Sequence, residues 1–173
     1  STLLQQVSAS LMRDLPLCYA TGEQSLRQIG QRSLRLGLDA AGMNLLADTS
    51  LENVLDQAQR CKAKVLVIDS IQTMTSENLP SSPGSVAQLR EGVGRIVQVA
   101  KQNDGSVFII GHVTKEGAIA GPRVVEHMVD TVLCFESDPA SRYTLIRSVK
   151  NRFGASGEMG VFAMTETGFR EVS

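Results

Sequence analysis

Polar side chains follow three aliphatic runs of the sequence, and these residues are the first candidates for chemistry. Asp69 and Ser70 close the run KVLVIDS, Glu23 follows LPLCYAT, and His112 follows SVFIIG. Runs without polar alternation are typical of strands that are buried on both faces of a parallel sheet. Ligands of such sheets bind at the carboxyl ends of the strands. We therefore expect these four residues to lie near one site.

Asp69 has the sequence context of a carboxylate that binds a magnesium-coordinated water. Four aliphatic residues followed by Asp form the Walker B pattern of nucleoside triphosphatases. Mg²⁺ is a hard ion that retains much of its water shell, and a carboxylate suits it. Many strands also end in an Asp that caps the next helix, so the pattern alone leaves both interpretations open.

Glu23 and His112 have one functional and one ordinary interpretation each. Glu23 could polarise an attacking water beside a phosphate and a metal ion, or it could be a solvated residue at a helix N-terminus. His112 could sense a γ-phosphate, or it could be a hydrogen-bonded loop histidine. No second His, Cys or acidic cluster has metal-ligand spacing from His112, so the sequence predicts no metal bound by it.

Two pairs of cations could contact phosphate groups. Lys115 lies in the glycine-rich run VTKEGAIAGP and Arg123 follows it, so both could contact a nucleic-acid backbone. Lys150 and Arg152 project to the same face of an extended run. They could act like an arginine finger on a phosphate across a subunit interface. An ordinary flexible loop and a solvated turn are the alternatives.

The elements that position these residues alternate between helix and strand. This order predicts an α/β fold with a mostly parallel sheet flanked by helices, extended at one edge by antiparallel C-terminal strands. Capping-box spacing at Thr49 and Glu52, and at Ser85 and Gln88, marks two helix starts. The predicted helices cover residues 1–12, 25–36, 51–58, 86–100 and 124–130, and the predicted strands cover 15–21, 44–48, 64–70, 106–111, 131–136, 142–150, 160–165 and 169–172.

Composition excludes several classes of protein. The net charge of -1 excludes a uniformly basic nucleic-acid coat but leaves room for a local basic loop. Aromatic residues make up 4% with no Trp, which argues against base-stacking platforms. No apolar run approaches the ~20 residues that span a bilayer. The absence of a signal peptide pattern in residues 1–11 predicts a cytoplasmic location without membrane association.

The three cysteines are far apart, and with two histidines they predict neither a disulfide scaffold nor a structural zinc site. Cys18 and Cys134 lie in apolar runs and are expected in the core. The phosphate-binding pattern GxxxxGK[ST] does not occur. Because Ser1-Thr2-Leu3-Leu4 matches the end of such a loop in the form GKSTLL, we expect a chain that is truncated at the P-loop.

Nearly the whole sequence resembles the RadA (Sms) family of bacterial DNA-repair proteins. The matching strings are TGEQSLRQI, VLVIDSIQT, SSPGSVAQLRE, GHVTKEGAIAGPRVVEHMVDTVL, RYTLIRSVKNRFG and GVFAMTETGFREVS, of which GHVTKEGAIAGP and KNRFG are the most specific. The resemblance implies that residues 1–173 form a single RecA-like domain of a P-loop NTPase. It also implies a DNA-dependent ATPase in the full-length protein, with this segment inactive if it lacks the loop.

The implied activity is that of a DNA-repair and recombination motor. Such a motor uses ATP and Mg²⁺, binds single-stranded DNA, and couples hydrolysis to branch migration of recombination intermediates. The implied partners are a RecA-type recombinase and further copies of the chain in a ring. The family's zinc module and Lon-protease-like domain are absent from this sequence, and Gln24 replaces a second Glu of the family's pattern.

The resemblance also implies roles for single residues. Ser1, Thr2, Asp69 and Ser70 would bind the nucleotide, with Ser1 and Asp69 holding Mg²⁺. Glu23 would orient the hydrolytic water, and His112 would sense the phosphate. Lys115 and Arg123 would contact DNA, loop 73–84 would face the ring channel, and Lys150 and Arg152 would couple the nucleotide to DNA.

Two alternatives from other classes remain open at the level of sequence. The first is a nucleotide-free RecA-like module for oligomerisation or interaction, which the missing Walker A pattern favours. The second is the ATPase part of a Lon-type protease-like protein, for which no Ser–Lys pair stands out by spacing.

Overall fold

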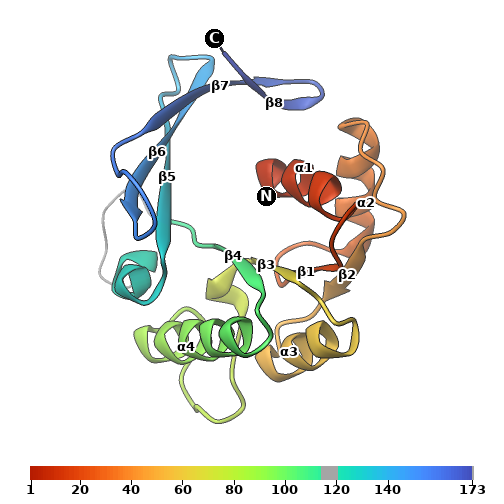
Figure 1. The fold of residues 1–173 in the computed structure, drawn as a ribbon, viewed down its shortest axis with the longest axis vertical. Helices are drawn as coiled ribbons and strands as arrows, with labels where there is room; N and C mark the ends of the chain where they lie inside the picture. Colours follow the sequence, from red (N-terminus) through yellow and green to blue (C-terminus); the bar gives the residue numbers. More distant parts are fainter. Residues whose placement is uncertain (114–120, 173) are drawn as a thin grey trace.

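A computed structural model describes residues 1–113 and 121–172, which form two four-stranded sheets with helices packed around them (Figure 1). The parallel sheet has the strand order β2-β1-β3-β4, and the antiparallel sheet has the order β5-β6-β7-β8. The strands are β1 (Leu17–Thr21), β2 (Asn44–Ala47), β3 (Val65–Asp69), β4 (Ser106–Ile110), β5 (Thr131–Ser137), β6 (Tyr143–Asn151), β7 (Met159–Thr165) and β8 (Gly168–Glu171). The helices are α1 (Thr2–Leu11), α2 (Leu26–Arg35), α3 (Leu51–Arg60) and α4 (Val86–Gln102), with the 3-10 helices η1 (Ile71–Thr73) and η2 (Pro122–Met128).

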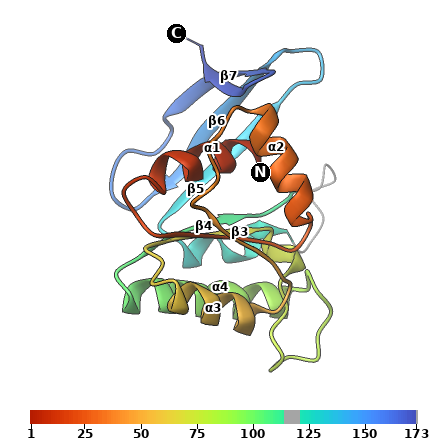
Figure 2. The same cartoon turned by 90° about the vertical axis from the view of Figure 1, so that its right-hand side faces the viewer.

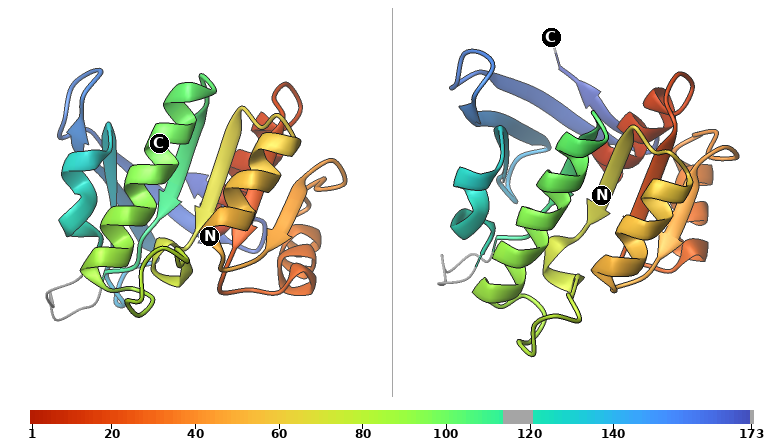
Figure 3. Two further views of the ribbon diagram at one scale, coloured as in Figure 1. Left: turned by 90° about the horizontal axis from the view of Figure 1, so that it is seen from below. Right: turned by 60° about the horizontal axis from the view of Figure 1, so that its bottom comes forward.

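Helices cover both faces of the parallel sheet, as the aliphatic strands predict. Helices α3 and α4 lie on one face and α1 and α2 on the other (Figures 1 and 2). Every residue of β1 and β3 is buried. Alternate side chains of these two strands enter separate cores, with Ile68 among the α3 and α4 residues and Tyr19 among those of the opposite face. In Figure 3, α3 and α4 lie side by side on the same face of the parallel sheet.

The antiparallel strands form a sheet of their own, which differs from the expected extension of the parallel edge. Strand β5 pairs with β6, and within the described residues neither β5 nor any later strand pairs with β4. Half-buried and exposed residues alternate through the first five positions of β5. This alternation is typical of an antiparallel sheet with one covered face and not of a strand buried on both faces.

The C-terminal sheet curls back to the first helix (Figure 1). The side chain of Gln6 donates to the carbonyl of Phe169 at 3.2 Å and accepts from its backbone N–H at 2.9 Å. These two bonds fasten β8 to α1, although the residues lie at opposite ends of the chain. The contact places the antiparallel sheet over the α1 side of the parallel sheet.

The helix starts differ in detail from the sequence prediction. Helix α3 is capped by Ser50 and not by Thr49, because the Ser50 side chain accepts from the Asn53 N–H. Ser85 caps α4 as predicted. Ser25 and Gln28 form a complete capping box at α2, which the sequence reading did not identify. Across the described residues, no helix combines the length and apolar character that a bilayer crossing requires.

Cys18 confirms the prediction of a core thiol, since it is 1% exposed on β1. Burial, together with the nearby Cys61, raises the pKa of Cys18 to about 11. Cys134 is only half-buried, and all three cysteines are free thiols.

Candidate active site

Glu23, Asp69 and His112 meet at the carboxyl edge of the parallel sheet. Thr21 lies opposite Asp69 in the register of β1 and β3, and Asp69 lies opposite Ile110 in that of β3 and β4. One potential ligand atom from each of the three residues lies within 4.8 Å of the other two. The sequence-based argument against metal-ligand spacing at His112 is therefore wrong. Spacing reveals ligands on one element, whereas these three come from the ends of three strands.

Asp69 is the most buried member of the cluster. Its side chain is 0% exposed, and Oδ2 accepts a hydrogen bond from the Tyr19 hydroxyl at 2.7 Å. Within the described part of the chain, no donor reaches the other oxygen, Oδ1, which is also buried. A buried carboxylate oxygen without a partner is costly. Because Mg²⁺ and its bound waters are suitable partners for a carboxylate oxygen, the site fits the predicted cation.

Tyr19 is a site residue that the sequence analysis missed. Burial raises its pKa, and the charge of Asp69 and the hydrogen bond to it raise this pKa further. The hydroxyl therefore remains a neutral donor that fixes one oxygen of Asp69. A signal was present in the sequence, because a Tyr in the middle of a buried strand needs a partner for its hydroxyl.

Two groups hold one oxygen of the Glu23 carboxylate. The Ser70 hydroxyl donates to Glu23 Oε1, and His112 Nε2 lies 3.1 Å from the same atom. The side chains of Glu23 and His112 are 34% and 56% exposed. The carboxylate is thus held through one oxygen and is still reachable from solvent, as a group that positions water requires.

The N-terminus of α1 belongs to the same neighbourhood. Ser1 is the N-cap residue of α1, whose first helical residue is Thr2. Helix N-termini attract anions such as phosphate. The structure places Ser1 at the N-terminus of α1, and its role as a Walker A hydroxyl stays a prediction.

Arg32 is a second residue that the sequence analysis missed. From α2 it donates to the side-chain oxygen of Gln24 at 2.9 Å, and Gln24 donates its backbone N–H to Thr21 Oγ1 at 3.1 Å. The resemblance noted Gln24 only as a departure from the family's pattern. Its contact shows one consequence of the departure, since a neutral amide leaves the charge of Arg32 uncompensated at this contact.

Lys150 and Arg152 do not join the cluster in the described residues. Lys150 Nζ donates to the carbonyl oxygens of Glu126 and Val129 at 3.0 and 2.7 Å. Arg152 forms an ion pair with Asp130 at 2.7 Å. Both cations thus brace the segment that leads from η2 into β5.

Of the two cations predicted to contact DNA, Arg123 is exposed in η2. Lys115 lies outside the described residues.

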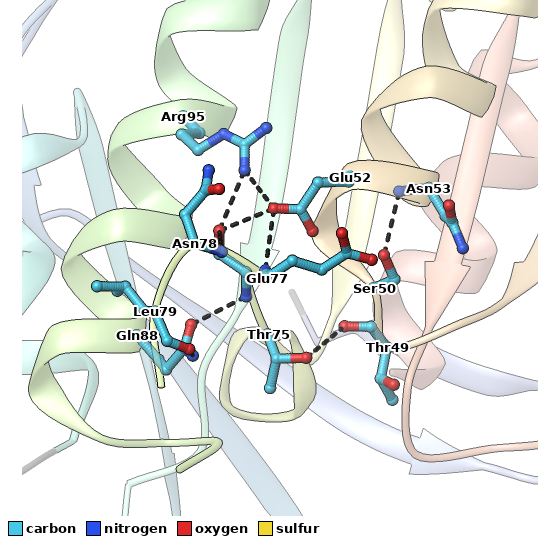
Figure 4. A network of polar contacts seen from close by, with 11 residues as sticks. Thr49, Ser50, Glu52, Asn53, Thr75, Glu77, Asn78, Leu79, Gln88 and Arg95 are labelled. Atoms are coloured by element: carbon cyan, nitrogen blue, oxygen red, sulfur yellow. Dashed lines mark hydrogen bonds and ion pairs between the residues drawn. The ribbon is translucent and has the colours of Figure 1, made fainter. Parts of the chain in front are cut away.

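Loop 73–84 is anchored on the α3 and α4 side of the molecule (Figure 4). Arg95 pairs with Glu52 at 2.6 Å, and the Ser76 hydroxyl donates to the same Glu52 oxygen at 2.8 Å. The Gln88 side chain accepts from the Ser76 N–H and donates to the carbonyls of Leu79 and Ser81. Glu52 and Gln88, which the sequence assigned to capping boxes, therefore hold this loop with their side chains.

Curated proteins that resemble the chain share one description. RadA DNA-repair proteins are 50% identical in Pseudomonas aeruginosa, 47% in Escherichia coli and 45% in Bacillus subtilis, with alignments over 99–100% of this chain. Over its whole length, the chain is therefore similar to one segment of the RadA proteins. The RadA-like chain spans 38% of the length of these relatives. It matches no family model.

Solved structures identify the fold of the RadA-like chain. A KaiC-like protein of Pyrococcus horikoshii has a TM-score of 0.68 at 15% identity and covers 93% of this chain, which spans 77% of that protein. The RadB recombinase has a TM-score of 0.68 at 17% identity and covers 99% of this chain, which spans 84% of that protein. At these identities the likeness concerns the fold alone, and it confirms the predicted RecA-like architecture.

Proposed function

We propose that this RadA-like chain is the core of a cytoplasmic ATP-dependent motor for DNA repair and recombination. The observation that carries the proposal is the unpartnered, buried Oδ1 of Asp69 beside Glu23 and His112 at the carboxyl edge of the sheet. The names of the relatives, DNA-repair proteins, support the cellular role. Residues 1–173 would form one domain of that protein.

The acidic cluster would bind the cation and position water. Asp69 Oδ1 and the Ser1 hydroxyl would hold Mg²⁺, while Thr2 and Ser70 would face the nucleotide. Bound there, Mg²⁺ neutralises charge on the phosphates during transfer. Glu23 would accept a hydrogen bond from the hydrolytic water, with its carboxylate kept in place by Ser70 and His112.

His112 would connect the nucleotide to DNA. It precedes the glycine-rich run that carries Lys115 and leads to Arg123, and we propose that this run binds single-stranded DNA in a ring of subunits. Loop 73–84 would face the same channel, and Lys150 and Arg152 would act at the interface between neighbouring subunits. Branch migration alongside a RecA-type recombinase is the output that this arrangement would support.

ATP hydrolysis by the full-length protein, with and without single-stranded DNA, tests the proposal. We expect Mg²⁺-dependent hydrolysis that DNA stimulates, and a loss of about 100-fold or more in kcat for Asp69→Asn and for Glu23→Gln. Asp104→Asn is the matched control, because Asp104 follows α4 at the opposite end of β4 and its φ of 50° suits Asn. A folded protein that hydrolyses no ATP would contradict the motor and favour a nucleotide-free interaction module.

DNA binding is tested separately from hydrolysis. Lys115→Ala combined with Arg123→Ala should weaken binding of single-stranded DNA and flatten its dependence on salt, because fewer phosphate contacts release fewer counterions. Arg60→Ala is the control, since Arg60 forms an exposed ion pair with Asp56 on α3. Unchanged DNA binding in the double variant would refute the loop assignment. Peptide hydrolysis would support the Lon-type alternative.

A further inference from the structure

We propose that Glu23, Asp69 and His112 bind a first-row transition-metal dication directly and without nucleotide. The same cluster would then serve as a regulatory metal site in the absence of nucleotide, and it would hold Mg²⁺ when ATP is bound. The regulatory part of the inference rests on the proposed function, whereas the metal binding itself does not. Its ligands are two carboxylates and one imidazole, which come from the ends of β1, β3 and β4.

The geometry of the three side chains suits one small ion. Their potential ligand atoms lie within 4.8 Å of one another, and Glu23 Oε1 and His112 Nε2 are 3.1 Å apart. Bonds of about 2.0–2.2 Å to nitrogen and oxygen place two ligands of one ion about 3–4 Å apart. Small side-chain rotations are therefore sufficient to converge on a metal.

The burial and hydrogen bonding of Asp69 are independent evidence for a bound cation. It is 0% exposed, Tyr19 occupies Oδ2, and within the described residues nothing donates to Oδ1. One carboxylate oxygen of Asp69 lies within 4.8 Å of the Glu23 and His112 ligand atoms. A cation bound among the three side chains would give Asp69 Oδ1 its missing partner, and the exposed Glu23 and His112 leave a path from solvent.

The imidazole decides the class of metal. Carboxylate oxygens alone suit Mg²⁺ and Mn²⁺, whereas an added imidazole favours transition metals such as Mn²⁺, Co²⁺ and Zn²⁺ over Mg²⁺. Two carboxylates also neutralise a dication. A metal held here engages the Glu23 oxygen that Ser70 and His112 otherwise orient, so the occupied site opposes the positioning of water by Glu23.

Mn²⁺ binding to the nucleotide-free, full-length protein tests the inference by electron paramagnetic resonance. Loss of the free-ion signal counts bound Mn²⁺, and pulsed measurements detect coupling to an imidazole ¹⁴N. We expect bound Mn²⁺ with ¹⁴N coupling in the wild type. In His112→Gln we expect loss of that coupling and an affinity lower by about tenfold or more. His127→Gln is the matched control, because His127 is the other histidine and is exposed on η2.

Three results would overturn the inference. They are the absence of nucleotide-free Mn²⁺ binding, ¹⁴N coupling that survives in His112→Gln, and coupling that is lost in His127→Gln. Hydrolysis of MgATP is measured on the same preparation, so the two ideas fail separately. A protein that hydrolyses MgATP but binds no Mn²⁺ without nucleotide retains the proposed function and loses the metal site. A protein with the ¹⁴N signal and no hydrolysis retains the metal site and loses the motor.

Discussion

Gln72 and His112 exchange two hydrogen bonds across the carboxyl edge of the parallel sheet. Gln72 Nε2 donates to the His112 carbonyl at 2.8 Å, and the His112 backbone N–H donates to Gln72 Oε1 at 3.3 Å. The His112 side chain in turn contacts Glu23. A residue of η1 thus fixes the backbone of the residue that orients the candidate water-positioning carboxylate.

Gln72→Ala should loosen the end of β4 without disturbing the core. Two exposed hydrogen bonds are lost, and one such bond contributes about 1 kcal/mol net. We expect the backbone amide of His112 to exchange with deuterium about fivefold faster or more, because 1.4 kcal/mol corresponds to tenfold. Gln98→Ala on the exposed face of α4 is the control. Unchanged exchange at His112 would show that the pair does not hold this strand end.

Tyr19→Phe should destabilise the protein through Asp69. The substitution removes the only donor to Asp69 Oδ2 within the described residues and leaves a fully buried carboxylate without a protein partner. Removing one partner of a buried polar group costs about 1–3 kcal/mol. Urea unfolding should show this loss, whereas Tyr143→Phe at a half-buried position of β6 should show less. Equal stability of the wild type and Tyr19→Phe would contradict the role of the hydroxyl.

The parallel half of the fold follows closely from the sequence, whereas the second sheet does not. Aliphatic runs such as VLVID identify buried parallel strands because both of their faces meet helices. The separation of β5 from β4 depends on tertiary pairing, which local periodicity does not encode. The contact between Gln6 and Phe169 joins the two ends of the chain and is equally invisible to local patterns.

The three central residues of the candidate site were predictable from the sequence, but the hydrogen bonds that hold them were not. Asp69, Glu23 and His112 emerge from strand ends, and sequence order together with the rule for parallel sheets is enough to collect them. Tyr19 and Gln72 act through hydrogen bonds that depend on the register of β1 and β3 and on the path of η1. The residue type of Tyr19 indicates that its hydroxyl needs a partner, but residue types alone identify neither Asp69 as that partner nor Gln72 as the partner of His112.

Glu52 should make stability depend on pH in the acidic range. Burial raises its pKa, but hydrogen bonds from Ser76, its own backbone, Arg95 and Glu77 outweigh this effect and hold the pKa below its usual value. A carboxyl with a lowered folded pKa stabilises the protein above its unfolded pKa of about 4.3. This contribution disappears as pH falls through the folded pKa.

Urea unfolding of Glu52→Gln at neutral pH and at about pH 3 measures this contribution. We expect the variant to be less stable than the wild type at neutral pH and the difference to shrink in acid. Asp56→Asn is the control, because its ion pair with Arg60 is exposed and such pairs contribute about 0–1 kcal/mol. A difference that stays constant with pH would refute the role of the Glu52 charge.

Lys150→Met separates a structural role from a role in coupling. The ammonium donates to two backbone carbonyls between η2 and β5, and hydrogen bonds to charged groups contribute about 1.5–3 kcal/mol. We expect lower stability in urea if bracing is its main role. Lost DNA-stimulated hydrolysis at unchanged stability would instead support action at a subunit interface. Arg142→Met, at an exposed arginine before β6, controls for the loss of one charge.

Gly22→Ala should strain the loop that carries Glu23. A Cβ at position 22 would lie 2.1 Å from Thr73 Oγ1 and 2.6 Å from Thr73 Cβ, so η1 or the end of β1 must shift. Overpacking of this kind costs about 1–3 kcal/mol.

Gly30→Ala is the opposite case, because a Cβ there meets nothing within 4 Å in the interior of α2. It should stabilise the protein by up to about 1 kcal/mol.

The cause of the strain at Gly22 can be isolated with a second substitution. Thr73→Gly removes both clashing atoms but also the hydrogen bond from Thr73 Oγ1 to the Ser70 carbonyl at 2.8 Å. In a double-mutant cycle measured by urea unfolding, Gly22→Ala should therefore cost less in the Thr73→Gly background than in the wild type. Additive effects would show that the close approach of η1 is not what requires glycine beside Glu23.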